Sequence, residues 1–405
     1  MGVNIALLWA RDTYSYGCMM MAENFIHHLN KLLGNVSYYT DAYDEDIVRL
    51  SADTGSTSIH KISDLGYSGF NVERDKRRDI KNIFFSLTDA RNLPAIFKKN
   101  SIKNFVVLGG DVLSEYYSIF GPIKNMMILN YLAKSGINIF IVGHTIGPFR
   151  SWRVPLMKNL LSHDNIHIYT RDMKTYAYLK DDMGLKNVVA SADLAFLDLP
   201  KQSGDMLIKY GLDENDYITV VPSSFWNLYS DDAESYADSW CDVVERLLKK
   251  SDKKIVLLAH DVRPNKDDRK MIDKIAERIK DERLVAIKDV LYPYQAREIL
   301  GKGHLTITGR MHAAISTFKM RKPAISISYS VKYDGVIGTD LNMPELIIEK
   351  EVFNSNSLGA AVEEKLDYVT DNYDRLIKEI SDTVPDVEKK SAEQIEDVAR
   401  KIGGI

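Results

Sequence analysis

Short apolar runs alternate with longer amphipathic stretches over most of the chain. In the first half, the runs predicted as buried strands are 3–9, 35–40, 104–108, 138–142 and 166–170. In the second half, they are 217–221, 254–259, 284–287, 305–308 and 324–327. Stretches with helical spacing separate most of these runs, which is the pattern of β-α-β units with parallel strands. The two series predict an α/β fold with two Rossmann-like domains that face a cleft.

The interruption between the two series predicts the domain boundaries. A stretch at 199–210 contains Pro, Gly and Ser and shows no clear period, so we interpret it as a linker. We therefore expect an N-terminal domain at 1–200, a C-terminal domain at 201–356 and C-terminal helices at 357–405. Residues 41–65 also show no clear period, and we expect them to be irregular.

The most informative unit lies at 305–335, where a predicted strand, a helix and a second strand follow one another. Arg310 and His312 stand at the start of the helix, Thr308 is the expected N-cap, and Lys332 follows the second strand. Parallel strands place their carboxyl ends at one edge, where helix N-termini favour anions. Two cations and an imidazole there suit phosphate, or phosphate with carboxylate. The alternative is that the arginine forms a structural ion pair and the histidine is a satisfied, partly buried residue.

Comparable residues follow the strands of the first half. Gly109 and Gly110 leave one predicted strand, His144 leaves the next, and Arg171 is a third cation directly after a strand. Because glycine permits close approach or a positive φ, we interpret these exits as one edge of a substrate site. Tight loop geometry alone would explain the same glycines. Asp193 is a further binding candidate, with loop capping as its alternative role.

Composition and charge narrow the classes of partner. Lys and Arg number 53 against 57 Asp and Glu, so the net charge is −4 and no domain-wide positive field favours nucleic acid. Cys18 and Cys241 have no metal-ligand spacing, and a reducing cytoplasm fits them best. No run approaches the ~20 apolar residues that span a bilayer, so any membrane contact would be peripheral. The basic run at 74–78 is a candidate for it, although most such runs are solvated helix faces.

Six motifs, in this order, resemble those of the polysaccharide pyruvyl transferase family. They are GGD (109–111), GHTIGPF (143–149), TRD (170–172), ASADLAF (190–196), TGRMHA (308–313) and SYSVKYDG (328–335). Each lies at a predicted β/α boundary, and together they cover roughly residues 100–340. The chain departs from the family pattern at Asp111 in the glycine triplet, at Leu194 in place of a proline, and at 17–19, where Gly-Cys-Met replaces an acidic motif.

The resemblance implies a fold similar to the GT-B glycosyltransferases and a transferase activity. Family members move the enolpyruvyl unit of phosphoenolpyruvate onto two hydroxyls of one sugar, forming a cyclic ketal in a surface, exopolysaccharide or capsule precursor. The substrate-binding arginine, histidine and lysine of the family fall on Arg171, His312 and Lys332. We expect the first and last to bind the phosphate and carboxylate of the donor, with Arg310 supporting the pocket. His312 is the candidate acid–base group, because histidine titrates near neutral pH.

Phosphoenolpyruvate would be a co-substrate, so we expect no cofactor and no metal. The expected location is the cytoplasm, at the inner face of the membrane if the sugar acceptor is lipid-linked. Two other functions stay open. One is a nucleotide-sugar glycosyltransferase of the same architecture, in which Arg310 and Lys332 would bind a diphosphate. The other is a non-catalytic member of the fold.

Overall fold

The computed structural model describes residues 2–66, 90–116, 118–353, 355 and 357–404. By their internal contacts, they belong to two compact units. The first unit is Met1–Thr13, Met21–Leu197 and Lys389–Ile405. The second unit is Tyr14–Met20 and Asp198–Glu388.

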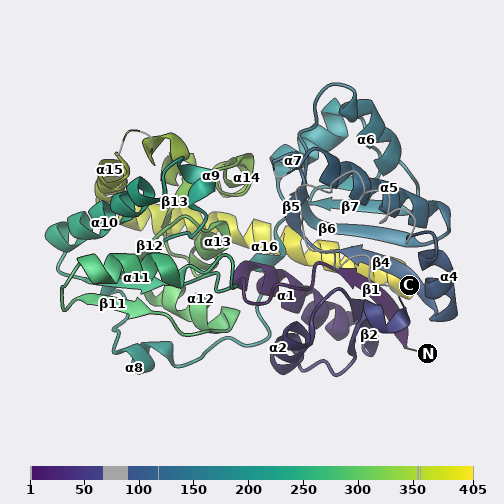
Figure 1. Ribbon diagram of the computed structural model, residues 1–405, viewed down its shortest axis with the longest axis horizontal. Coiled ribbons are helices and arrows are strands. Elements are labelled where there is room, and N and C mark those ends of the chain that lie inside the picture. The colour runs from purple at the N-terminus through teal and green to yellow at the C-terminus, as the bar shows by residue number, and fades with distance from the viewer. Residues whose placement is uncertain (1, 67–89, 117, 354, 356, 405) are drawn as a thin grey trace. The chain divides into compact units, whose positions relative to one another are not determined.

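Parallel strands form the sheet of the first unit (Figure 1). They are β1 (Val3–Leu8), β2 (Val36–Thr40), β3 (Ile59–Lys61), β4 (Ile102–Val107), β5 (Gly110–Leu113), β6 (Asn138–Ile146), β7 (Ile166–Thr170) and β8 (Val188–Val189). Their order is β3-β2-β1-β4-β6-β7-β8, with β5 paired to β6. The accompanying helices are α2 (Asp44–Thr54), α4 (Leu93–Lys99), α5 (Phe120–Lys134), α6 (Arg153–Leu161) and α7 (Met173–Ala177). Helix α1 (Tyr16–Leu33) begins in the second unit and continues in the first.

Burial explains why these strands have continuous apolar runs. In β4, β6 and β7 most side chains on both faces of the sheet are buried. Helix α4 packs on β4, and α5 packs on β5 and β6. A parallel sheet covered in this way needs apolar residues at successive positions, not at alternate ones.

The second unit repeats this organisation with a smaller parallel sheet. Its strands are β9 (Tyr217–Val221), β10 (Lys254–Leu258), β11 (Leu284–Ile287), β12 (Leu305–Thr308), β13 (Ala324–Ser328) and β14 (Ile347–Glu349), in the order β11-β10-β9-β12-β13-β14. Its helices are α8 (Met206–Tyr210), α9 (Trp226–Tyr229), α10 (Ala233–Lys250), α11 (Arg269–Arg278), α12 (Pro293–Lys302), α13 (Met311–Lys319), α14 (Val331–Tyr333) and α15 (Leu358–Asp371). The predicted α/β class with two Rossmann-like sheets is therefore confirmed.

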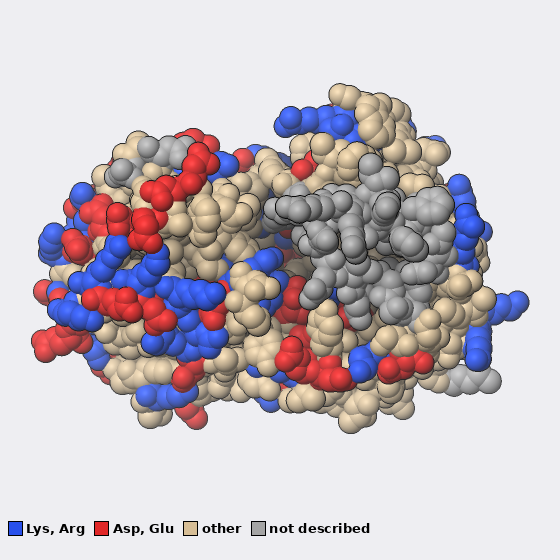
Figure 2. Space-filling view, in the orientation of Figure 1, with Lys and Arg blue, Asp and Glu red and all other residues tan. Residues whose placement is uncertain are grey.

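The surface of the second unit agrees with the near-neutral composition. Figure 2 shows basic and acidic side chains interspersed over the region of α10 and α11. Ion pairs join these two helices, including Lys274 with Glu234 and Arg278 with Asp238. Exposed pairs of this kind contribute little stability each, but they keep the surface free of a single-sign field.

Residues 41–65 are not irregular as predicted. They form α2, β3 and a short 3₁₀ turn. Three acidic residues occupy the first turn of α2, where the helix dipole favours them, and Gly55 ends the helix in the left-handed conformation. The prediction failed because these end signals are strong while the apolar period within the helix is weak.

The two predicted exit loops are also partly wrong. Gly110 begins β5, and β6 continues through Gly143 and His144 to Ile146. His144 pairs with Gly110 on one side and with Thr170 on the other, so neighbouring strands extend β6 beyond its apolar run. The positive φ of 59° at Gly143 coincides with a register shift in the ladder.

The division of the chain differs from the predicted boundaries in three places. The first unit reaches Leu197, and α8 forms within the predicted linker. Residues 357–405 are not a separate part, because α15 groups with the second unit and α16 (Tyr373–Gly403) is divided between the units at Glu388. Tyr14–Met20 groups with the second unit although its neighbours in sequence belong to the first. The predicted basic run at 74–78 lies outside the described residues.

Candidate functional site

Arg171 is a buried cation at the carboxyl end of β7 in the first unit. Its side chain is 1% exposed, and its Nε and Nη2 atoms donate hydrogen bonds to Thr145 Oγ1 at 3.0 and 2.7 Å. Thr145 in turn donates to Asp172 Oδ2 at 3.1 Å. The nearest carboxylate oxygen in an ion pair with Arg171 is Asp193 Oδ2, at 3.8 Å from Nη1. Hydrogen bonds to a neutral hydroxyl therefore fix this guanidinium, while Asp193 compensates its charge from a longer distance.

Asp193 also caps a turn, which is the alternative to a role in substrate binding. Its Oδ1 atom accepts a hydrogen bond from the backbone N–H of Ala195 at 2.8 Å, at the start of a short 3₁₀ turn. The side chain is fully buried beside Arg171. Asp193 thus caps a turn and faces a cation at the same time.

Backbone packing explains Gly109 and Gly110. A Cβ atom on Gly109 would lie 2.4 Å from the carbonyl oxygen of Gly143, and Gly110 has a φ of 149°. The buried His144 lies nearby, and its Nδ1 atom donates to the carbonyl oxygen of Thr145 at 3.0 Å. Burial lowers the pKa of His144 to about 4, so this imidazole is neutral near pH 7. Close backbone packing thus accounts for the two glycines without a ligand, and the part of all three residues in substrate binding stays a prediction.

Arg310 of the second unit is neutralised by carboxylates. Its Nη2 and Nε atoms lie 2.5 and 3.1 Å from the two carboxylate oxygens of Asp268, and Nη1 lies 3.4 Å from Asp261 Oδ2. Its guanidinium also stacks on the ring of Phe225, with 4.0 Å between Cζ and the ring centroid. Residues 261 and 268 follow β10, roughly forty to fifty positions before Arg310, so no local sequence pattern indicates this partnership. The geometry favours the structural alternative for this arginine.

The predicted cap of α13 is wrong. Arg310 itself is the N-cap residue, in an extended conformation, and its side chain makes no capping hydrogen bond. Thr308 Oγ1 accepts a hydrogen bond from the N–H of Arg310 at 2.8 Å, one position before the helix begins. As a result, Arg310 and His312 do not share the first turn of a regular helix, and they are free to serve different roles.

His312 is the second residue of α13 and lies against the N-terminal segment Tyr14–Met20 of the same unit. A Cβ atom added to Gly17 would lie 2.3 Å from His312 Nδ1. His260, fully buried at the end of β10, is close enough for its pKa to respond to His312. Burial is the larger cause and lowers the pKa of His260 to about 3, so this imidazole is neutral. The sequence signal for this histidine is its position directly after the predicted strand at 254–259.

Lys332 follows β13 and lies among tyrosines. Its side chain is largely buried, its Nζ lies 4.4 Å from the ring centroid of Tyr329 and 5.8 Å from that of Tyr333, and Nζ donates to the hydroxyl of Tyr329. Aromatic faces attract a cation and hold it in place. Because Arg171 belongs to the first unit while His312 and Lys332 belong to the second, the convergence of all three stays a prediction.

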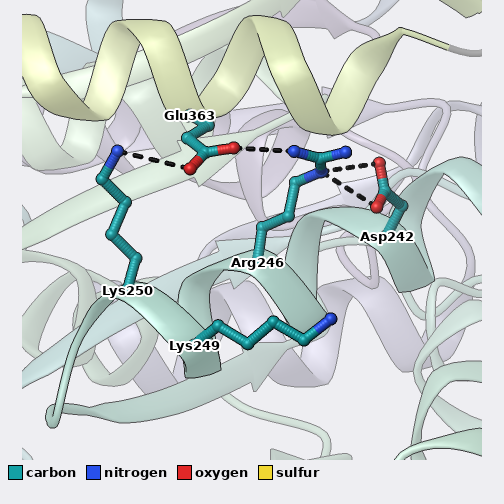
Figure 3. Close-up of a pocket in the computed structure, with 5 residues that line it drawn as sticks. All are labelled: Asp242, Arg246, Lys249, Lys250 and Glu363. Carbon is teal, nitrogen blue, oxygen red and sulfur yellow. Dashed lines mark hydrogen bonds and ion pairs between the residues drawn. The ribbon is translucent and has the colours of Figure 1, made fainter.

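A surface cavity of about 410 Å³ lies elsewhere in the second unit, between α10 and α15 (Figure 3). Its lining residues are Asp242, Arg246, Lys249, Lys250 and Glu363. Arg246 pairs with Asp242 at 2.9 Å and with Glu363 at 2.7 Å, and Lys250 lies 3.4 Å from Glu363. The residues that line this cavity therefore form an ion-pair network that joins two helices, and none of them is a candidate site residue.

Within the part of the chain that the structure describes, no group of three or more His, Cys, Asp and Glu side chains could hold a metal ion. In the same residues, no helix is both long and apolar enough to cross a membrane.

Comparison with known proteins gives one family and one fold. A sequence model of the family "Polysaccharide pyruvyl transferase" matches residues 16–331. The amylovoran biosynthesis protein AmsJ of Erwinia amylovora is 22% identical over 306 residues, which cover 72% of this chain and 71% of AmsJ. The matched segment of the family model includes Arg171 but ends one residue before Lys332, and it contains His312.

Solved structures show the same architecture at low sequence identity. S. aureus MnaA with UDP is 12% identical, with a TM-score of 0.63 over 98% of this chain and 96% of that one. The UDP-GlcNAc 2-epimerase of Neisseria meningitidis is 11% identical, with a TM-score of 0.60 over 99% and 100%. The sucrose-phosphate synthase of Thermosynechococcus elongatus is 11% identical, with a TM-score of 0.59 over 99% of each chain. The likeness over nearly the whole of each chain confirms the predicted GT-B-like fold.

Proposed function

Because this chain belongs to the polysaccharide pyruvyl transferase family, we propose that it transfers the enolpyruvyl unit of phosphoenolpyruvate to a sugar of a surface polysaccharide precursor. The observation that carries the proposal is the family match over most of the chain, joined to the position of the candidate residues. Arg171, His312 and Lys332 each follow a parallel strand closely, at the edge where such folds bind ligands. Family membership by itself supports a transferase of polysaccharide biosynthesis.

The donor explains why cations are needed. Phosphoenolpyruvate carries a phosphate and a carboxylate, and we expect Arg171 and Lys332 to bind one each. The guanidinium of Arg171 is hydrogen-bonded to a hydroxyl and the ammonium of Lys332 lies over a tyrosine ring, so both cations are held in position. Preorganised cations of this kind stabilise developing negative charge without reorganisation during the reaction.

The chemistry requires one proton to be delivered and two to be removed. We expect His312 to protonate the methylene carbon of the donor, which leaves an oxocarbenium-like centre at C2. The first sugar hydroxyl adds to this carbon and loses its proton, and the C2–O bond to phosphate then breaks. The second hydroxyl adds to the same carbon, loses its proton and closes the cyclic ketal, while phosphate carries away one of the released protons.

Replacing His312 by alanine tests the acid–base assignment. We expect phosphate release from phosphoenolpyruvate, measured with a sugar acceptor present, to slow by about 10²–10⁴-fold. His60→Ala is a matched control, since His60 is exposed on β3 of the other unit. If the His312 variant turns over at nearly the wild-type rate, His312 has no part in the proton transfers.

Donor binding tests the two cations. In calorimetric titration with phosphoenolpyruvate, Arg171→Ala and Lys332→Met should each weaken the affinity, and unchanged affinity in both variants would refute the proposed clamp.

A thermal-shift panel of phosphoenolpyruvate against UDP- and GDP-sugars tests the glycosyltransferase alternative. Stabilisation by a nucleotide sugar and none by phosphoenolpyruvate would favour that alternative. We further expect the protein to work in the cytoplasm, at the inner face of the membrane if its acceptor is lipid-linked.

A further inference from the structure

The first turn of α1 packs directly against the imidazole of His312. A Cβ atom built on Gly17 would lie 2.3 Å from Nδ1, 2.5 Å from Cγ and 2.8 Å from Cβ of this histidine. Cβ atoms essentially never approach other heavy atoms within 3.0 Å. Position 17 therefore accommodates glycine only, as long as His312 keeps its present place.

Hydrogen bonds hold this turn to the rest of the second unit, so a movement of the turn away from His312 would break them. The backbone N–H of Tyr16 donates to the carbonyl oxygen of His260 at 3.1 Å, and that of Val262 donates to Tyr14 at 2.9 Å. The phenol oxygen of Tyr16, which is fully buried, accepts the N–H of Leu291 at 2.8 Å. The backbone beside the imidazole is thus anchored from both of its sides.

A second imidazole completes the surroundings of this turn. The ring of His260 meets the ring of Tyr16 edge-on, with 5.4 Å between the centroids. Because burial keeps the pKa of His260 near 3, this ring stays neutral and does not compete for a proton at ordinary pH. His312 is the imidazole of this pair that a Cβ atom on Gly17 would meet.

We propose that Gly17 is a positioning residue for His312: without a side chain at this position, the turn rests against the imidazole and fixes its orientation for proton transfer. The contact itself is independent of the proposed function, whereas its catalytic consequence rests on that function. The competing explanation is that glycine serves only the backbone conformation at position 17. In that case, substitutions at Gly17 and His312 would have independent effects.

Stability measurements test the contact. Alanine is a better helix former than glycine, so Gly17→Ala should stabilise α1 unless it meets an obstacle. We expect it to lower Tm by roughly 2–10 °C through overpacking. In a His312→Ala background the same substitution should cost little or nothing, because the obstructing ring is gone. An equal loss of Tm in both backgrounds would overturn the proposal.

A matched control and a fallback keep this test decisive. Gly338→Ala changes a glycine of the same unit whose added Cβ would meet no atom nearer than 3.6 Å, so it should leave Tm and kcat near wild type. If Gly17→Ala yields no soluble protein, recovery of soluble protein in the double variant supports the contact. Insolubility of the double variant, with His312→Ala itself soluble, contradicts it.

Kinetics test the positioning role. We expect Gly17→Ala to lower kcat by at least about 10-fold, within the range of general acid–base contributions, with a smaller change in KM for phosphoenolpyruvate. The same change should have no further effect in the His312→Ala background. If Gly17→Ala retains wild-type kcat despite a lowered Tm, the positioning role is wrong. If His312→Ala is fully active, the proposed function fails at this residue, while the Tm comparison still decides the contact.

Discussion

Replacing Arg310 by methionine tests whether this buried cation stabilises the second unit. The substitution removes the charge but keeps an apolar side chain of similar length beside Phe225. Asp268, which is fully buried, would lose its two contacts at 2.5 and 3.1 Å, and Asp261 would lose its partner at 3.4 Å. Removing one member of a buried ion pair costs about 3–5 kcal/mol, because a buried charge is left uncompensated.

The pH dependence of this loss follows from Asp268. Burial raises the pKa of its carboxyl group above 3.8, while Arg310 acts in the opposite direction, so the variant should have a still higher folded-state pKa. A carboxyl group whose pKa is higher in the folded than in the unfolded protein destabilises the fold as pH rises above the unfolded value. The destabilisation should therefore be greatest at neutral pH and shrink as pH falls towards 4, where the folded variant can protonate Asp268.

The assay is thermal unfolding of wild type and variant between pH 5 and pH 8. For a unit of about 200 residues, a loss of 3–5 kcal/mol corresponds to a fall in Tm of roughly 6–20 °C. Arg278→Met is the control, because Arg278 pairs with Asp238 and Glu234 on the exposed surface and should lower Tm far less than Arg310→Met does. A normal Tm for Arg310→Met together with lost donor binding would refute the structural role and favour substrate binding.

Three further predictions follow from other contacts. His144→Asn should flatten the loss of stability between about pH 6.5 and 4 in urea unfolding, because in the wild type only the unfolded state protonates this imidazole over that range; an unchanged slope would contradict burial as the cause. Tyr16→Phe should lower the free energy of unfolding by about 1 kcal/mol, since the N–H of Leu291 loses its acceptor, and no change would mean that water replaces the phenol. Glu363→Gln should lower the free energy of unfolding only slightly at low salt and not at all at 1 M NaCl, as expected of an exposed network around Arg246; a salt-independent loss would refute that interpretation.

The strands were predictable where burial alone determines them. The runs of β7, β9 and β12 match the predicted bounds, because strands covered on both faces need apolar residues throughout. The bounds of β11 also match, although this strand lies at the edge of its sheet and only Ile287 is buried. The extension of β6 was not predictable, since its last residues include Gly143 and His144, and pairing with β5 and β7 decides their conformation. The local sequence predicts an element when burial of its own side chains stabilises it. The prediction fails when pairing with neighbouring strands determines the conformation.

The candidate site shows the same division between local and distant causes. That Arg171, His312 and Lys332 follow parallel strands closely was evident from the order of strands and helices. That Gly17 lies against His312 was not, because the two are almost 300 positions apart and no periodic pattern links them. The grouping of Tyr14–Met20 with the second unit is what reveals the contact.

Charge compensation distinguishes Arg310, a structural cation, from Arg171, a candidate for binding the donor. Arg310 and Arg263 face Asp261 and Asp268, so two positive and two negative charges cancel within this cluster. Arg171 is buried more deeply, with 1% of its side chain exposed against 11% for Arg310. Its Nε and Nη2 atoms donate to a threonine hydroxyl, and among the described residues its ion-pair partner is a carboxylate at 3.8 Å. A buried charge with such weak compensation costs stability, and an anionic ligand would relieve that cost. This contrast supports donor binding at Arg171 and argues against it at Arg310.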